Sequence, residues 1–234
     1  MRKKCESISI MQPTYLPWLG YFDLINSVDC FVFLDDVQFA RRSWQQRNKI
    51  LLNGAEHTLT VPVFSKGKRD QLINEVIIND EGGWRKKHSD TLVSAYQKAN
   101  KNRMLLYKIL DVINSDEVRL SKLNQSIIEI IIRHIGITTD LLTSSEIGCV
   151  GSSSNKLFNI CKAIGGKIYV SAAGSKGYIE REKVFEKNKM QVRYHDYVCK
   201  KYSQKGSSSF IPQMSAIDFL FNSNMQDIRS AFKY

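Results

Sequence analysis

The sequence contains few prolines and glycines and no long apolar run. Four prolines and 13 glycines in 234 residues exclude collagen-like and low-complexity chains. A membrane-spanning helix needs roughly 18–20 consecutive apolar residues. The best candidate, residues 127–135, is interrupted by Glu129, Arg133 and His134. With 43% hydrophobic and 24% charged residues, the composition is that of a globular protein. The sequence therefore predicts a globular chain with no transmembrane segment.

Cysteine is scarce and irregularly spaced. The five cysteines include no CxxC pair, so their spacing supports neither a disulfide framework nor a zinc site. The basic start, MRKKC, is followed by Glu6 and Ser7 rather than by the apolar core of a signal peptide. We therefore expect a cytoplasmic protein with reduced thiols.

The charge is unbalanced, with 34 basic residues against 23 acidic ones and a net charge of +11. The positive residues form short clusters instead of a polybasic tail, and no nucleic-acid-binding motif is present. This pattern predicts no specific binding of nucleic acid. It favours an anionic small substrate or a peripheral contact with a membrane surface.

The N-terminal third has the pattern of a parallel βαβ unit. Residues 7–11 form a short apolar strand, residues 21–27 have helical spacing, and the apolar run 31–34 ends at Asp35. Further strands are predicted at 141–145, 167–174 and 190–198. The expected fold is α/β: a Rossmann-like, mostly parallel sheet flanked by helices, in one domain over residues 1–234.

A helical segment is predicted in the middle of the chain, at about 84–136. Three helices are expected there, at 84–99, 103–114 and 117–135, and Gly136 suits the end of the last helix because glycine tolerates left-handed backbone. Two short strands, at 57–62 and 72–78, are predicted before it.

The loops that follow the first two strands hold the first group of candidate site residues. Ligands of open parallel sheets bind beyond the carboxyl ends of the strands, so polar and aromatic residues at these ends should share one edge. Asp35 is predicted to be catalytic. The predicted substrate-binding residues of this group are Gln12, Thr14, Tyr15, Trp18, Tyr21, Asp36 and Gln38. The alternative is a tight turn packed with aromatic side chains.

No metal site is predicted. Asp35 and Asp36 could bind Mg²⁺ together with a substrate phosphate. Neighbouring residues of a strand point to opposite faces, however, so at most one of the two could face a shared ion.

A second group of candidates is the run RRSWQQRN, residues 41–48. Arginine binds phosphate and carboxylate oxygens with two parallel hydrogen bonds. Arg47 and Asn48 are the preferred substrate-binding candidates, because the apolar residues that follow would anchor them. A solvated charged loop is the alternative.

The third group of candidates is Trp84, His88 and Tyr96. They are expected to lie on one face of a helix, because residues four apart project from the same side. An imidazole titrates near neutral pH, so His88 is the predicted general base and Trp84 a predicted substrate contact. A structural role for His88 is the alternative, and His195 is the second candidate base.

Several segments together resemble the WbqC-like protein family, over residues 8–224. They are MQPTYLPWLGYFDLI, FVFLDDVQFARRSWQQRNKI, LTVPV, WRKKH, YVSAAGSKGY and FIPQMSAIDFLFN. The resemblance implies a role in O-antigen, lipopolysaccharide or other surface-polysaccharide synthesis. The family pattern has His-Pro before a tyrosine where this chain has Cys199 and Lys200, so no histidine role is carried over there. Tyr202 and Gln204 match the family and are predicted to bind substrate.

The resemblance favours a transferase that moves an acyl or aminoacyl group to a nucleotide-linked amino sugar. No cofactor is firmly implied. The donor could be a thioester on coenzyme A or on an acyl-carrier-type protein, whose acidic groups would suit the basic surface.

Two other functions remain open. A nucleotidyltransferase- or ligase-like enzyme would use ATP and Mg²⁺. The segment from Pro13 to Ile25 is similar to the phosphate loop of such enzymes, but Tyr21 stands where they carry a histidine. A non-catalytic binding protein of the polysaccharide machinery is the third possibility.

Overall fold

The computed structural model describes residues 5–98 and 102–232, which form two compact units. We call the first the sheet unit; it comprises the described parts of residues 1–12, 23–36 and 138–198. The second, the helical unit, comprises those of residues 13–22, 37–137 and 199–234. Each unit is therefore assembled from three separate stretches of chain. Whether the two behave as one domain stays a prediction.

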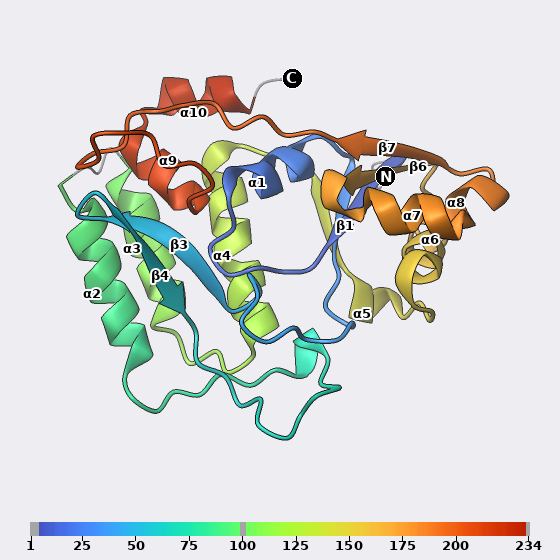
Figure 1. Ribbon diagram of the computed structural model, residues 1–234, viewed down its shortest axis with the longest axis horizontal. Helices are drawn as coiled ribbons and strands as arrows, with labels where there is room; N and C mark the ends of the chain where they lie inside the picture. The colour runs from blue at the N-terminus through green and yellow to red at the C-terminus, as the bar shows by residue number, and fades with distance from the viewer. Residues whose placement is uncertain (1–4, 99–101, 233–234) are drawn as a thin grey trace. The chain divides into compact units, whose positions relative to one another are not determined.

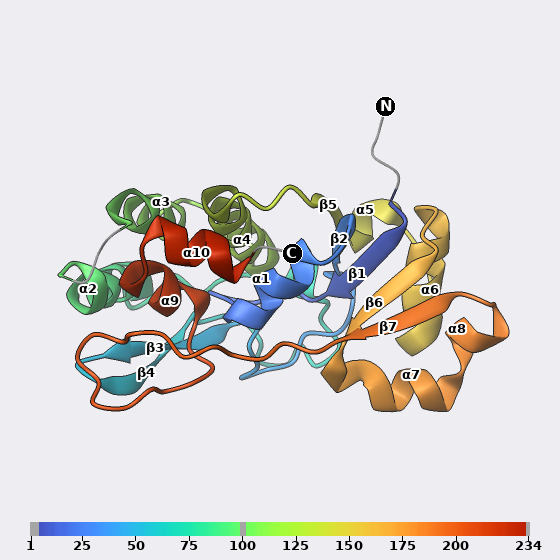
Figure 2. The same cartoon turned by 90° about the horizontal axis from the view of Figure 1, so that it is seen from above.

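The sheet unit contains a five-stranded sheet in the order β5-β2-β1-β6-β7 (Figure 1 and Figure 2). Every neighbouring pair is parallel, which confirms the predicted Rossmann-like α/β fold. The strands are β1 (Ser7–Met11), β2 (Cys30–Phe33), β5 (Asp140–Thr143), β6 (Ile168–Ala172) and β7 (Gln191–His195). The order reverses direction at β1, since β2 lies on one side of it and β6 on the other.

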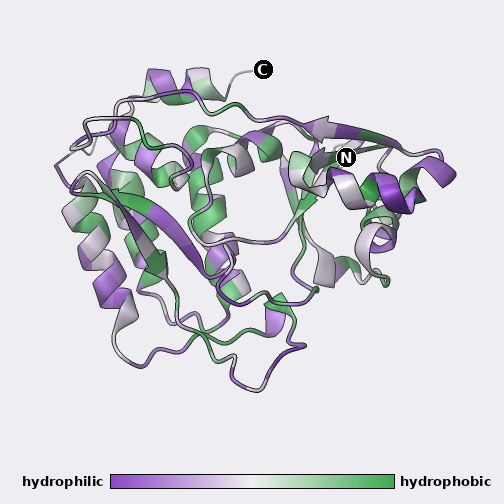
Figure 3. Cartoon of the chain, viewed as in Figure 1, coloured by the Kyte–Doolittle hydropathy of each residue, from purple (hydrophilic) through white to green (hydrophobic). Residues whose placement is uncertain are grey.

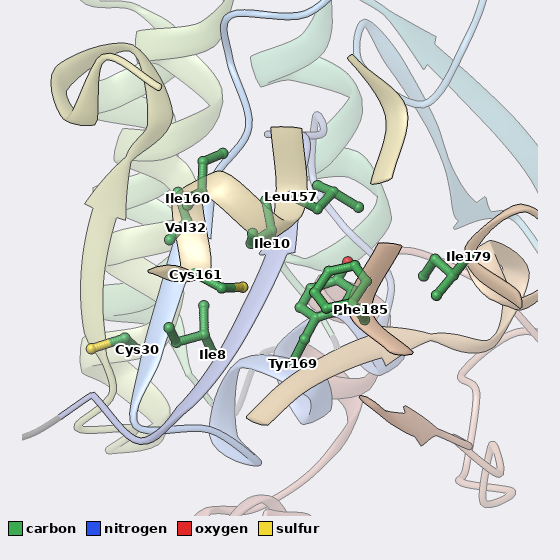
Figure 4. Packing of buried hydrophobic residues seen from close by; sticks show 10 residues of the cluster. All are labelled: Ile8, Ile10, Cys30, Val32, Leu157, Ile160, Cys161, Tyr169, Ile179 and Phe185. Atoms are coloured by element: carbon green, nitrogen blue, oxygen red, sulfur yellow. The ribbon is translucent and has the colours of Figure 1, made fainter. Parts of the chain in front are cut away.

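One face of this sheet is covered by helices that follow β5 and β6. They are α6 (Ser153–Ala163), α7 (Lys176–Glu182) and α8 (Val184–Lys187) (Figure 2). Ile8 and Val32 of the strands pack there against Leu157 and Ile160 of α6 and Phe185 of α8 (Figure 4). Burial of such side chains contributes about 1.5–3 kcal/mol each, which explains why the strands are continuous apolar runs.

Two short helices and a 3₁₀ turn complete the sheet unit. The helix α5 (Ser144–Ile147) follows β5 directly, and η2 (Ala173–Ser175) follows β6. The connection from β1 to β2 is α1 (Leu19–Asn26), whose first half belongs to the helical unit and whose second half belongs to the sheet unit.

The helical unit is built on a β-hairpin and five helices. Its elements are β3 (Arg47–Leu52), β4 (Ala55–Thr60), η1 (Ile73–Glu75), α2 (Trp84–Tyr96), α3 (Arg103–Ile113), α4 (Leu120–Ile135), α9 (Ala216–Asn222) and α10 (Met225–Ala231). Hydrophobic residues recur along α3 and α4, where Ile109 and Ile127 are completely buried (Figure 3). The three helices predicted between residues 84 and 136 are present, and Gly136 ends α4 with a φ of 81°.

The hairpin turn requires its glycine. Asn53 and Gly54 both have positive φ, 52° and 79°, as a two-residue turn matched to the strand twist demands. A Cβ on Gly54 would also lie 2.2 Å from the carbonyl oxygen of Gly206. This close approach leaves no room for a side chain.

Three sequence-based expectations about secondary structure and cysteine pairing are wrong. Residues 72–78 form a 3₁₀ turn and isolated bridges in place of a strand, because Leu72 and Ile78 pair with single residues of different segments, Gln38 and Val63. Ser144 and Ser145 begin a helix instead of ending a strand. Cys5 and Cys30 form a disulfide, because the pairing of β1 with β2 brings their Cα atoms to 5.4 Å.

Among the described residues, no helix has both the length and the apolar character needed to cross a bilayer.

Candidate functional site

The carboxyl edge of the parallel sheet is the candidate site of the sheet unit. The register places Phe33, Thr143 and Met11 at one level, and Ala172 opposite His195. The residues that follow each of these therefore emerge at the same edge. The reversal of strand order at β1 marks this edge further, because ligands of such sheets bind where the order reverses.

Asp35 is locked in place at this edge by the serines that follow β5. Its carboxylate accepts hydrogen bonds from Ser145 N–H at 3.1 Å and Ser145 Oγ at 2.9 Å. The Ser144 hydroxyl lies 3.1 Å from both Asp35 Oδ1 and the Asp35 backbone nitrogen, whose N–H it accepts. Asp35 is only 1% exposed, and these hydrogen bonds hold the start of α5 against the end of β2. The catalytic role assigned to it from the sequence stays a prediction.

Asp36 forms a buried ion pair with Lys156 of α6. Lys156 Nζ lies 2.7 Å from Asp36 Oδ2, and the two side chains are 9% and 15% exposed. The same ammonium donates to the Asp36 carbonyl oxygen at 3.2 Å, while the Ser144 hydroxyl donates to Asp36 Oδ1. Loss of one partner from a buried pair typically costs 3–5 kcal/mol. The pair therefore fixes α6 to the end of β2 and presents both a donor and an acceptor.

The expectation that Asp35 and Asp36 point to opposite faces is wrong. Both carboxylates meet the Ser144 hydroxyl, because both residues lie beyond Phe33, where β2 and its alternation end. One fixed hydroxyl thus joins two carboxylates at the edge.

An open cavity of about 450 Å³ lies at the start of α6. Ser152, Ser153 and Asn155 line it from α6 and the residue before it, and Glu182 and Lys187 line it from α7 and α8. Glu182 accepts hydrogen bonds from Ser153 Oγ at 2.6 Å and Ser154 N–H at 3.0 Å, which lower the pKa of its carboxyl group. The first turn of α6, the helix that carries Lys156, therefore also presents polar groups to this cavity.

The loop after β1 is anchored inside the helical unit. Asn48 Nδ2 donates to the carbonyl oxygens of Tyr15 and Leu16, at 3.1 and 2.7 Å. Asn124 Nδ2 holds the carbonyl oxygen of Pro13 at 3.1 Å. The predicted substrate-binding residue Asn48 is 4% exposed and acts as a loop anchor. The structure thus does not place this loop and Asp35 in one compact unit.

The aromatic candidates of this loop differ in exposure. Tyr15 and Tyr21 are 0% and 1% exposed, so they are core side chains of the helical unit. Trp18 is 36% exposed, and its ring lies against Gly20, where a Cβ would come within 2.4 Å of it. Thr14 is half-buried. Their roles in binding substrate stay predictions.

His88 is a buried member of a hydrogen-bonded set. Its Nδ1 lies 2.9 Å from the hydroxyl of Tyr15, and the ring also bonds the backbone of Thr60. Burial lowers the pKa of His88 to about 4, so the ring is neutral at pH 7. One ring nitrogen carries the hydrogen and donates it to the Thr60 carbonyl oxygen. The other, Nδ1, then accepts a hydrogen bond from the Tyr15 hydroxyl. Both nitrogens are then engaged, which gives the ring a structural role; catalysis by His88 stays a prediction.

Trp84 contacts the same histidine edge-to-face, with ring centroids 5.0 Å apart. Its Nε1 donates to Asp80 Oδ1 at 2.8 Å, and Arg85 binds the same carboxylate and holds its pKa below the usual value. Trp84 is 5% exposed and borders an open cavity of about 420 Å³.

Tyr202 and Gln204 converge on a residue that the sequence did not single out. The Tyr202 hydroxyl and Gln204 Nε2 donate to Asp218 Oδ2 at 2.8 and 2.9 Å, and the Tyr96 hydroxyl donates to Asp218 Oδ1 at 3.1 Å. Burial raises the pKa of Asp218 above its usual value. This buried cluster links α9 to the segment before it and to α2.

The remaining candidates lie at the surface or close to it. Gln38 is exposed and donates from Nε2 to the Arg69 carbonyl at 3.0 Å. Arg47 is half-buried at the start of β3, opposite Thr60. Gln12 is half-buried and follows β1 at the carboxyl edge.

Lys156, Ser144 and Ser145 were missed from the sequence. Lys156 is 120 residues from Asp36, and the two come together only because α6 packs on the sheet beside β2. The serine-rich run before α6 was a usable signal, since serine is common where helices begin.

Metal ligands come together at one place among the residues described. Cys5, Cys30 and Asp140 lie close enough to share an ion, but the two sulfur atoms are joined in the disulfide, so no thiolate is available.

Comparison with known proteins supports one family. The model of the WbqC-like protein family matches residues 12–230. An uncharacterized protein of Mycobacterium tuberculosis, Rv1507c, is 32% identical over 218 residues, which cover 93% of this chain and 94% of that protein. No solved structure matches.

Proposed function

The chain belongs to the WbqC-like protein family, and from this premise we propose that it is a transferase of surface-polysaccharide synthesis. It would transfer an acyl or aminoacyl group to the amine of a nucleotide-linked amino sugar. The donor would be a thioester on coenzyme A or on an acyl-carrier-type protein, and the reaction would take place in the cytoplasm.

The observation that carries this proposal is the polar cluster of Asp35, Asp36, Ser144 and Lys156 at the carboxyl edge. Doubly wound sheets bind nucleotides at this edge, and a carboxylate after the second strand of the βαβ unit holds ribose hydroxyls. Each sugar hydroxyl both donates and accepts a hydrogen bond. The Asp36–Lys156 pair offers an acceptor and a donor within 2.7 Å of each other.

The first test is binding, measured by calorimetry with UDP- and dTDP-linked amino sugars and with the free sugars. Nucleotide-linked sugars should bind more tightly, because phosphate adds charge that a basic protein can offset. Asp36→Asn should weaken binding, and Asp111→Asn, an exposed change on α3, is the matched control. Equal or absent binding of both classes of sugar would overturn the proposal.

Arg47 is the residue proposed to offset the phosphate charge. Arg47→Ala should weaken binding of the nucleotide-linked sugar by roughly 1.5–3 kcal/mol, the usual loss of a charged hydrogen bond. Arg41→Ala, an exposed arginine of the same run, should leave binding unchanged. Identical affinities of the two variants would remove Arg47 from the proposal.

Activity is tested by incubating the protein with nucleotide-linked amino sugars and thioester donors. The masses of the products are then measured by mass spectrometry. A product heavier by the acyl or aminoacyl group is expected. Binding without any product would favour the non-catalytic alternative.

One observation favours a second candidate, an ATP- and Mg²⁺-dependent ligase or nucleotidyltransferase. Asp35 and Asp36 both reach the Ser144 hydroxyl, and carboxylate oxygens are the ligands that Mg²⁺ prefers. Product formation that EDTA abolishes and only Mg²⁺ restores would select this candidate. The transferase should be insensitive to EDTA.

A further inference from the structure

A histidine and a carboxylate lie close together at the end of β7, in the sheet unit. His195 Nε2 is 2.8 Å from Asp23 Oδ2 of α1, and the two side chains are 14% and 13% exposed. Nε2 itself is fully buried, and its contact with the Asp23 carboxylate is close without the alignment of a hydrogen bond. The other ring nitrogen, Nδ1, takes part in no hydrogen bond with the described residues.

The register puts this pair at the same sheet edge as the candidate site. His195 is the last residue of β7 and lies opposite Ala172, the last residue of β6. The strand β6 borders β1, where the strand order reverses. With about 4.8 Å between neighbouring strands, His195 is roughly 10 Å from the line of β1. That separation is within the length of a nucleotide-linked sugar.

The other three histidines, all in the helical unit, are placed differently. His88 has both ring nitrogens engaged and a pKa of about 4. His134 lies on α4, where burial lowers its pKa, and His57 is exposed on β4. Of the four, His195 alone combines a carboxylate partner with a place at the carboxyl edge.

A carboxylate beside an imidazole does two things. It stabilises the imidazolium that forms when the ring takes up a proton from the substrate, and it holds the ring in one orientation. A carboxylate facing one nitrogen leaves the other nitrogen to exchange protons with a substrate.

We propose that His195 accepts the proton of the attacking amine and that Asp23 is the residue that positions it; this rests on the transferase function proposed above. The neutral amine of the sugar attacks the thioester carbonyl carbon. A C–N bond forms, the C–S bond breaks, and the sulfur leaves with the electron pair. His195 takes the proton from the nitrogen and passes it to the sulfur, so the products are an amide and a thiol.

The charged groups near His195 are few. Asp23 faces it from α1, and Arg193 lies on the same face of β7, where its guanidinium donates to the Ser27 carbonyl at 3.3 Å. Asp196 follows His195 and is exposed. Lys176 of α7 lies over the Tyr194 ring, on the opposite face of β7.

The test compares His195→Gln, Asp23→Asn and the control His57→Gln on the donor and acceptor pair that gives product with the wild-type protein. His195→Gln should lose on the order of 10²–10⁴ in kcat with KM nearly unchanged. Asp23→Asn should lose less in kcat, again with KM nearly unchanged, because the ring keeps its proton-accepting nitrogen but loses the carboxylate that holds it in one orientation. His57→Gln should match the wild type.

A wild-type kcat for folded His195→Gln would overturn the inference and leave the transferase function standing. If the wild-type protein gives no product with any pair, the proposed function fails instead. A kcat of folded Asp23→Asn equal to that of the wild type would remove Asp23 from its positioning role.

Discussion

At the scale of single residues, burial decides what a side chain can do. His88 and His195 show this contrast. His88 is buried against Tyr15 and Trp84, whereas His195 is the last residue of a strand and lies beside a carboxylate. The free energy of leaving a buried hydrogen-bonding group unpaired is about 1–3 kcal/mol. His88→Gln should therefore lower the melting temperature, and folded protein should keep near wild-type activity. Normal folding with a loss of 10²–10⁴ in kcat would restore His88 as the base.

The same histidine predicts a pH dependence of stability. Its pKa falls from 6.5 in the unfolded chain to about 4 in the folded one, so the unfolded state binds more protons between these values. The stability that comes from keeping His88 neutral is fully present above pH 6.5, declines as the pH falls, and is lost below about pH 4. It amounts to about 3 kcal/mol at 1.36 kcal/mol per pKa unit. Denaturant unfolding at pH 4.5 and pH 7 measures the free energy of unfolding at each pH. The difference between the two values should be smaller for His88→Gln than for the wild type. Equal differences would contradict the lowered pKa of His88.

At the scale of elements, two linkages hold segments that are distant in the sequence. Tyr202 connects the segment before α9 to Asp218, a carboxylate that also bonds Tyr96 of α2. Tyr202→Phe removes one hydrogen bond to a buried carboxylate and should cost about 1.5–3 kcal/mol of stability. Tyr107→Phe, at a site 47% exposed, is the matched control. Thermal unfolding measures both. Unchanged stability of Tyr202→Phe, with weaker sugar binding, would instead support the substrate contact predicted from the sequence.

The disulfide is the second linkage, and it joins the residues before β1 to the start of β2. A cross-link 25 residues apart removes loop entropy from the unfolded chain that is worth about 3 kcal/mol. Cys5→Ser should therefore lower the melting temperature under oxidising conditions, whereas Cys199→Ser should not. In dithiothreitol, the wild type and Cys5→Ser should unfold at similar temperatures. A wild-type melting temperature that is insensitive to dithiothreitol would show that the bond contributes nothing.

At the scale of the whole molecule, the chain passes between its two units five times, since each unit consists of three stretches that alternate along the sequence. Neither unit is a continuous piece of sequence, and α1 is divided between them. We therefore expect a single unfolding transition with equal calorimetric and van't Hoff enthalpies. Two resolved transitions in a calorimetric scan would show that the single domain predicted from the sequence is wrong.

The sequence by itself determined the fold class and the local structure of its strongly periodic segments. Apolar runs and helical periodicity located β1, β2 and the helices of residues 84–136, because these signals depend on neighbouring residues. The tertiary structure decided which side chains meet. Asp36 with Lys156, Asp23 with His195, and Tyr15 with His88 are pairs far apart in the chain. Such contacts depend on strand order and on the packing of helices against the sheet, which periodicity does not encode. The sequence therefore left both a catalytic and a structural role open for His88, and only the tertiary structure showed its hydrogen bond to Tyr15.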